Sequence, residues 1–529
     1  MPSPAAAPEL SGRGGWIGAG RPITMAGLRG RVVVVFFWNL ADVASLRVIE
    51  ELRRLDHIHA EELTVVGVHC PGPAAGAGHD AVVRAVARHR LTHPVLDDPD
   101  ATTAAAFGVT GGPALVLVDQ QGSVVGTRYG EGHGPSVGRA VAELLAADHR
   151  RPGPRQDPLP APMPEPLAFP ARVAASPDGR LLAIADTGHD RVLVATVDGL
   201  VLSVFTGYLQ PSAVRFDGRR ALICDTVAGR AVWSNGEVLA DAMAWPWDLV
   251  DAGDGSWIVA EAGGHRLVRL RPGEIATRVA AGNGTRGRVD GPDLRAELDQ
   301  PAGLARDREG VLFVDSGAGS LRRLHAGRRG GEVTTLADGL HHPRGVAARP
   351  DGELVYVADT LASALLAWDG GRLTALAVDG LCEPGGLDVL PDGRLVVADT
   401  ANHRIVLVDP VDATLKPVVL DETWVHAGDG EPLVLSAGAS GPVPVRLELV
   451  DETSGPPARV VVTARPPTLL AGGEAQVTGL PGGTEVVEVR AGQPGQGLLL
   501  VEVTARTWAG GHLVDRVQRW RRRLDVNES

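Results

Sequence analysis

A short phrase that recurs six times through the middle of the chain constrains its fold more than any other feature. Each copy is an apolar stretch that ends in an acid, at Asp186, Asp225, Glu261, Asp315, Asp359 and Asp399. The gaps between successive acids are 39, 36, 54, 44 and 40 residues. Repeats of about 40–50 residues built from short strands are typical of β-propeller blades. The sequence therefore predicts a six-bladed β-propeller over residues 167–418.

Turn residues inside the repeats support antiparallel strands. Pro-Asp-Gly occurs at 177–179, 350–352 and 391–393, each time between two apolar runs. Proline presets φ and glycine accepts a positive φ, so this tripeptide favours a tight turn. These turns fit blades made of short strands that are joined by hairpins.

The first 147 residues show a different pattern, in which strands and helices alternate. The run VVVVFFW (32–38) is apolar throughout, as expected of a central strand buried on both faces. Helical spacing follows over 43–55, then a second strand (63–69), a second helix (80–89) and a hairpin that begins at 113. This order predicts a small α/β sandwich over residues 1–147.

Two further segments complete the organisation. Residues 148–166 contain seven prolines and no periodic apolar pattern, which predicts a semi-rigid linker. Residues 424–529 alternate apolar and polar residues between Gly/Pro turns, which predicts a small antiparallel, sandwich-like β domain.

Composition excludes several classes of function. The net charge of −13 argues against a nucleic-acid binder, because neutralising phosphates needs a basic surface. Lys416 is the one lysine and Pro417 follows it, so no Gly-Lys-Ser/Thr phosphate loop exists. Cys70, Cys224 and Cys382 form no CxxC pair. The start of the chain lacks an apolar leader, so we expect a cytoplasmic protein that does not bind or span a membrane.

Several motifs together identify a resemblance. The first domain has Leu28-x-Gly30 before the apolar strand, Gly67-Val68-His69 and Gly112-Pro113. The propeller has Asp399-Thr-Ala-Asn-His-Arg-Ile405 and an Ala281-Gly-Asn-Gly insertion. The chain resembles the NHL repeat-containing protein 2 family over nearly its whole length. The resemblance implies a thioredoxin-like domain, a six-bladed NHL propeller and a C-terminal β-stranded domain.

The chain departs from this pattern at the redox motif. In thioredoxin-like relatives a Cys-x-x-Cys follows the Phe-Trp strand end, and the helix N-terminus makes a thiol nucleophilic. Asp42 and Ser45 stand at these positions, and neither can form a disulfide. Pro113 occupies the place where the fold keeps a cis-proline. We therefore expect a thioredoxin-like shape with a degenerate CxxC that does not exchange disulfides.

The same region offers a candidate peptide-binding groove. In active relatives the loop beside the redox motif binds extended peptide, and loss of the cysteines does not remove this binding surface. The resemblance implies contacts from Trp38, Leu40, Gly112 and Pro113. We expect Trp38 and Leu40 to be exposed at its entrance.

Three histidines and the repeated acids could suggest a metal site in the propeller. His189, His265 and His403 lie near the same place in three repeats, as channel histidines do in amidating-lyase relatives of the NHL fold. The spacing argues for a structural role, because His189 follows its acid by three residues and the others by four. The six acids are expected to accept hydrogen bonds from turn N–H groups.

Gly282-x-Gly284-x-x-Gly287 matches a dinucleotide-binding fingerprint. That fingerprint requires a helix directly after it, and Asp290-Gly291-Pro292 leaves no room for one.

The sequence thus predicts a non-catalytic protein-interaction scaffold that binds a protein or peptide partner and needs no metal or cofactor. Two alternatives stay open: a thiol-redox protein of the thioredoxin-like class, and a metal-dependent hydrolase or lyase in the propeller channel.

Overall fold

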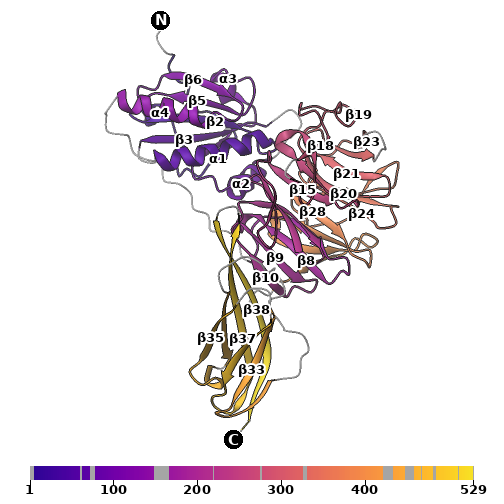
Figure 1. Ribbon diagram of the computed structural model, residues 1–529. Coiled ribbons are helices and arrows are strands. Elements are labelled where there is room, and N and C mark those ends of the chain that lie inside the picture. Colours follow the sequence, from indigo (N-terminus) through magenta and orange to yellow (C-terminus); the bar gives the residue numbers. More distant parts are fainter. Residues whose placement is uncertain are drawn as a thin grey trace. The chain divides into compact units, whose positions relative to one another are not determined.

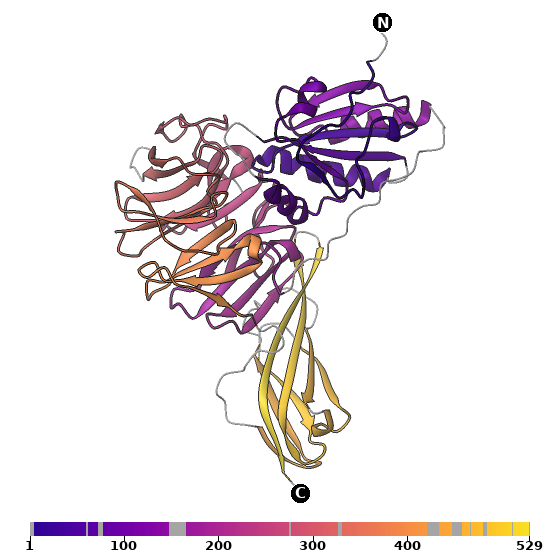
Figure 2. The same ribbon diagram turned by 180° about the vertical axis from the view of Figure 1, so that it is seen from behind.

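The computed structural model describes residues 5–59, 62–71, 78–147, 166–218, 220–274, 277–325, 331–420, 433–446, 458–465, 467–479, 484–509 and 512–527. The chain forms two compact units, Met1–Met163 and Pro164–Ser529 (Figures 1 and 2). Most of the predicted linker, residues 148–165, lies outside the described residues.

The first unit is built on a six-stranded sheet in the order β1-β4-β3-β2-β5-β6. Its strands are β1 Gly15–Ile17, β2 Val32–Trp38, β3 Leu63–His69, β4 Val95–Asp97, β5 Ala114–Val118 and β6 Val124–Tyr129. Its helices are η1 Ala26–Leu28, α1 Val43–Ile58, α2 His79–Arg88, α3 Thr102–Ala106 and α4 Gly134–Ala147. Strands β2, β3 and β4 are parallel, whereas β1, β5 and β6 pair antiparallel with their neighbours.

The central strand explains why this unit folds as it does. No residue of β2 is more than 1% exposed, because β3 and β5 flank the strand and side chains cover both of its faces. Helix α1 buries the stripe of Leu46, Ile49 and Leu52 and continues one turn beyond its predicted end, to Ile58. The result is the thioredoxin-like fold.

The second unit contains a six-bladed β-propeller, in which four consecutive antiparallel strands form each blade. Blade 1 is β7 Pro170–Ala175, β8 Leu181–Asp186, β9 Arg191–Thr196 and β10 Val201–Phe205. Blade 2 is β11 Pro211–Asp217, β12 Arg220–Asp225, β13 Arg230–Trp233 and β14 Val238–Ala240. Blade 3 is β15 Pro246–Asp251, β16 Trp257–Glu261, β17 Arg266–Leu270 and β18 Arg278–Ala281.

Blade 4 is β20 Pro301–Arg306, β21 Gly310–Asp315, β22 Ser320–His325 and β23 Glu332–Asp338. Blade 5 is β24 Gly345–Ala348, β25 Val355–Asp359, β26 Ala364–Trp368 and β27 Leu373–Ala375. Blade 6 is β28 Pro384–Val389, β29 Leu395–Asp399, β30 Arg404–Val408 and β31 Leu415–Val418. The short strand β19 Gly291–Pro292 adds to the outer edge of blade 4 by pairing with β23. Each predicted acid ends the second strand of its blade. Single 3-10 turns follow in three blades: η2 Thr187–His189, η3 Ala262–Gly264 and η4 Thr400–Asn402.

The ring closes without a blade shared between its two ends, because one continuous segment supplies each blade. The first strands of neighbouring blades contact one another around the ring, in the order β7, β11, β15, β20, β24, β28 and back to β7. Blades 1 and 6 also share a buried apolar cluster, to which Ile184 and Leu193 contribute from blade 1 and Val396 and Ile405 from blade 6.

A C-terminal β domain follows the propeller. Its elements are β32 Leu433–Ser436, β33 Ser440–Arg446, β34 Ala458–Arg465, η5 Pro467–Leu469, β35 Glu474–Gly479, β36 Thr484–Arg490, β37 Gly495–Ala509 and β38 His512–Asn527. The prediction of a purely antiparallel domain is wrong in one pair, since β32 runs parallel to β38. Strand β38 also pairs with the outer strand of blade 1, Val204 lying opposite Val517. The domain and blade 1 therefore share one continuous sheet.

Candidate functional site: a cap in place of a dithiol and a cross-linked propeller

The N-terminus of α1 holds a polar cap where thioredoxin-like relatives hold their dithiol. Asp42 precedes the helix with extended backbone, and its Oδ2 accepts hydrogen bonds from the Ser45 N–H (3.0 Å) and the Ser45 hydroxyl (2.9 Å). The Ser45 hydroxyl also accepts a bond from the Asn39 N–H, at 3.1 Å. Both side chains are buried, Ser45 completely. Carboxylates stabilise helix N-termini by binding such N–H groups.

Of the four residues predicted to contact a peptide, Gly112 is exposed and Trp38, Leu40 and Pro113 are buried. The Gly112–Pro113 peptide bond is cis, and Gly112 is exposed beside the end of β2. The expectation that Trp38 and Leu40 are exposed is wrong, because Trp38 is 1% and Leu40 6% exposed. The Trp38 ring packs edge-on against His69, with centroids 5.2 Å apart.

The cysteine nearest this site is poorly suited to thiolate chemistry. Cys70 follows β3, and its N–H donates to the Trp38 carbonyl oxygen at 2.9 Å. Burial and the neighbouring Asp98 carboxylate raise the pKa of the Cys70 thiol from 9.0 to about 12. All three cysteines are free thiols.

In the propeller, the six repeat acids perform one shared task. One carboxylate oxygen of each accepts a hydrogen bond of 2.6–2.8 Å from a backbone N–H two residues before the proline that starts the same blade. The donors are Ala168, Leu209, Ala244, Asp299, His341 and Cys382. The second oxygen binds an arginine five residues later in blades 1, 2, 3 and 6. The acids thus tie the start of each blade to the end of its second strand.

The residue after each acid joins neighbouring blades. A hydroxyl at this position donates to the carbonyl oxygen of the next blade's starting proline at five of the six junctions. The donors are Thr187, Thr226, Ser316, Thr360 and Thr400. Blade 3 carries Ala262 instead. The junction from blade 6 to blade 1 belongs to the same series, because Thr400 donates to Pro170.

The histidines are divided between two roles. His265 and His403 lie four residues after their acids with positive φ, and each Nδ1 accepts a backbone N–H from the next blade, Gln300 at 3.3 Å and Phe169 at 3.1 Å. The equivalent residue of blade 1 is Asp190, whose carboxylate accepts the Gln210 N–H. His189 instead contacts Asp186 of its own blade at 2.8 Å. Among the described residues no group of three His, Cys, Asp or Glu side chains is placed to hold a metal.

Four charged side chains on first strands fill the propeller axis. Arg172 of blade 1 pairs with Asp248 of blade 3 at 2.6 Å, and both are almost fully buried. Arg215 of blade 2 pairs with Asp388 of blade 6 at 3.3 Å and donates to the Leu304 carbonyl oxygen of blade 4 at 2.7 Å. These partners belong to non-adjacent blades, so the contacts cross the axis. We call Arg172, Arg215, Asp248 and Asp388 the axial quartet.

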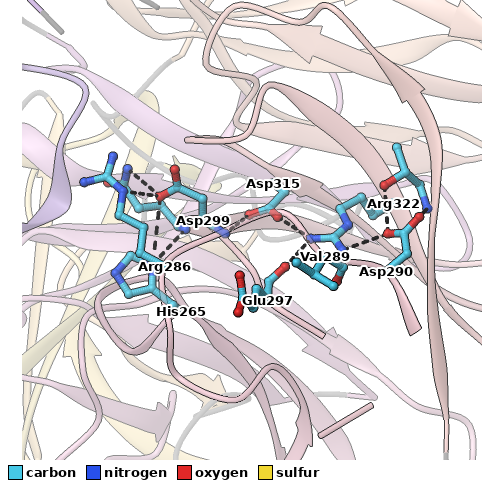
Figure 3. Close-up of polar contacts among 10 residues, drawn as sticks. His265, Arg286, Val289, Asp290, Glu297, Asp299, Asp315 and Arg322 are labelled. Carbon is cyan, nitrogen blue, oxygen red and sulfur yellow. Dashed lines mark hydrogen bonds and ion pairs between the residues drawn. The ribbon is translucent and has the colours of Figure 1, made fainter. Parts of the chain in front are cut away.

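The insertion between blades 3 and 4 is organised around one buried arginine (Figure 3). Arg322 donates to the carbonyl oxygens of Glu297 (2.8 Å) and Val289 (2.9 Å) and to the carboxylates of Asp315 (2.7 Å) and Asp290 (2.9 Å). Residues 282–290 form a loop between β18 and β19, without the helix that a dinucleotide site needs. Burial raises the pKa of Asp315 from 3.8 to about 7 despite the attraction of Arg322.

Two family models match the chain: AhpC/TSA family at residues 5–127 and NHL repeat at residues 381–406. NHL repeat-containing protein 2 of Gallus gallus is 26% identical over 476 residues, which cover 76% of this chain and 62% of that protein. Its Homo sapiens counterpart is 26% identical over 75% of this chain and 61% of its own length. The chain is a homologue of NHL repeat-containing protein 2.

The similarity has clear limits. The chain spans less than two thirds of the NHL repeat-containing protein 2 sequences that it matches. Protein SUPPRESSOR OF QUENCHING 1, chloroplastic, of Arabidopsis thaliana is 24% identical over 67% of this chain and 40% of that protein. Among solved structures, a virginiamycin B lyase from Staphylococcus aureus covers 48% of this chain and 85% of its own, at 11% identity and a TM-score of 0.37. No helix in the described part of the chain is long and apolar enough to cross a membrane.

The axial quartet and the role of Arg322 were not predicted from the sequence. A signal for the quartet exists, because each of its four members lies inside a first strand with an apolar residue on either side, whereas the other charged residues of these strands stand at strand ends. In blade 4, Ser320 replaces the usual arginine five residues after the acid, and Arg322 takes over its contact with the carboxylate.

Proposed function

We propose that the chain is a non-catalytic protein-interaction scaffold, in which a thioredoxin-like domain without redox chemistry accompanies an NHL propeller. The observation that carries the proposal is the hydrogen-bonded pair of Asp42 and Ser45 at the N-terminus of α1. Disulfide exchange needs a thiolate there, and these two side chains supply a helix cap instead. A protein or peptide partner would bind to the loops of this rigid framework.

Two of the three thiols support the same proposal. A thiol with a pKa of about 12, as at Cys70, is almost wholly protonated at neutral pH and a weak nucleophile. Burial also raises the pKa of Cys224, which lies in the propeller core. Neither cysteine is placed in the electropositive, exposed setting that reactive cysteines require.

The axial quartet weighs against the alternative of a metal-dependent hydrolase or lyase in the channel. Two guanidinium groups at the axis would repel a divalent cation, and their ion pairs engage both aspartates. His265 and His403 would have to give up hydrogen bonds at blade junctions to bind a metal. We assign the repeat acids and these histidines a structural role.

The experiment that tests the proposal is partner capture by a chain without sulfur nucleophiles. The variant Cys70→Ser/Cys224→Ala/Cys382→Ser should retain the partners that cross-linking captures on the intact chain. A mixed-disulfide mechanism requires at least one cysteine, so loss of the partners in this folded variant would contradict a scaffold. A cytoplasmic location, and partners other than nucleic acid or membrane, remain predictions from the sequence.

A further inference from the structure

The thioredoxin-like domain contains a pocket on the side of the sheet that α4 covers. Its volume is about 270 Å³, below the about 300–1,000 Å³ of pockets that hold drug-sized ligands. The pocket is lined by Val34, Leu115 and Leu117 from the sheet and by Val137, Ala140 and Leu144 from α4. Most of its lining is therefore aliphatic, and its volume is suited to a single apolar side chain.

The sequence explains why this space is not filled. Helix α4 buries only Val137 and Val141 fully, and Leu144 stays half-buried. Strand β6 is the edge of the sheet, and Gly126 presents no side chain to the helix. Alanines and glycines along α4 add little volume on the helical side. The gap is thus a consequence of small residues on both walls.

Two opposite charges line the pocket on facing elements. Arg128 comes from β6, and its Nη1 lies 3.5 Å from where a Cβ of Gly126 would stand. Its guanidinium donates to the Thr127 carbonyl oxygen at 2.9 Å and makes no ion pair within the described part of the chain, so N–H donors remain for a ligand. Glu143 comes from α4, and both charged side chains are exposed at the rim of the pocket.

We propose that this pocket binds a free α-amino acid with a large apolar side chain. The aliphatic lining would hold the side chain, Arg128 would bind the carboxylate, and Glu143 would bind the ammonium group. A fatty acid would satisfy Arg128 but would bring a second negative charge towards Glu143. An apolar amine would satisfy Glu143 but would bring a second positive charge towards Arg128. Only a zwitterion complements both walls.

The test is titration calorimetry on the full-length chain with L-phenylalanine and three analogues. Phenylpropionate lacks the ammonium group, phenylethylamine lacks the carboxylate, and glycine lacks the side chain. We expect saturable binding of L-phenylalanine and at least about tenfold weaker binding of each analogue, the factor that about 1.4 kcal/mol represents. Phenylpropionate binding as tightly as L-phenylalanine would overturn the proposal, as would no saturable binding of L-phenylalanine below about 10 mM.

Charge variants test each contact separately. Arg128→Gln should weaken L-phenylalanine about tenfold but not phenylethylamine, and Glu143→Gln should weaken L-phenylalanine but not phenylpropionate. Arg139→Gln is a matched control, because Arg139 is exposed on the same helix and does not line the pocket. An unchanged melting temperature without ligand would show that the variants fold. Equal affinities of all three variants for L-phenylalanine would contradict the proposed orientation.

Discussion

The Thr400 hydroxyl donates a hydrogen bond of 2.7 Å to the carbonyl oxygen of Pro170, 230 residues earlier in the chain. Thr400 follows the acid of the last blade, and Pro170 starts the first. The same hydroxyl-to-carbonyl hydrogen bond joins other neighbouring blades. One type of hydrogen bond therefore links successive blades and also closes the ring between blades 6 and 1.

Removing this hydroxyl should weaken the propeller most at its closure. Thr400→Val leaves the Pro170 carbonyl oxygen buried without its donor, which should lower the free energy of unfolding by about 1–3 kcal/mol. Thr187→Val is the matched control, because Thr187 makes the same contact between blades 1 and 2, which the chain also links covalently. Urea unfolding should show the larger loss for Thr400→Val. A larger loss for Thr187→Val would mean that closure depends on other contacts.

The axial quartet predicts strong coupling between Arg172 and Asp248. Arg172→Met leaves the Asp248 carboxylate buried without its closest cation and should cost about 3–5 kcal/mol of stability. Arg172→Met/Asp248→Leu removes both charges and should recover most of that loss, since apolar residues can replace a buried ion pair. A double-mutant cycle from urea unfolding measures the coupling. Additive losses would show that the two side chains act independently.

The number of blades could be predicted from sequence because its signals are local. An acid such as Asp399 and a starting proline such as Pro384 recur in each repeat, and both act within one blade. The buried strand β2 was predictable for the same reason, as seven consecutive apolar residues.

The sequence does not predict side-chain contacts that form only when the ring closes or when neighbouring strands pack. Arg172 and Asp248 are 76 residues apart and meet only because the ring brings blades 1 and 3 to one axis. Burial of Trp38 depends on His69, which the adjacent strand β3 places beside it. The apolar run 32–38 did indicate that Trp38 is buried, but its contact with His69 follows only from the pairing of β2 with β3.

His93 should make the thioredoxin-like domain sensitive to acid. Burial and the nearby Arg53 charge lower the pKa of His93 from 6.5 to about 4. The unfolded chain takes up a proton at His93 as the pH falls from 6.5 to 4, whereas the folded chain resists it. The contribution to stability is therefore complete above pH 6.5 and is lost towards pH 4, by about 3 kcal/mol.

His93→Gln removes this titration, so its stability should fall less between pH 7 and pH 4 than that of the unsubstituted chain. His57→Gln, at an exposed position of α1, is the control for replacing a histidine outside the core. Urea unfolding at both pH values gives the comparison. An identical pH dependence for His93→Gln and the unsubstituted chain would show that folding does not lower the pKa of His93.

The absence of disulfide exchange is the central claim, and insulin reduction in dithiothreitol measures it most directly. With Asp42 and Ser45 in place of a dithiol, the full-length chain should not accelerate insulin precipitation beyond dithiothreitol alone, whereas thioredoxin in the same assay should. Acceleration that rises with the concentration of the chain and approaches that of thioredoxin would contradict the account.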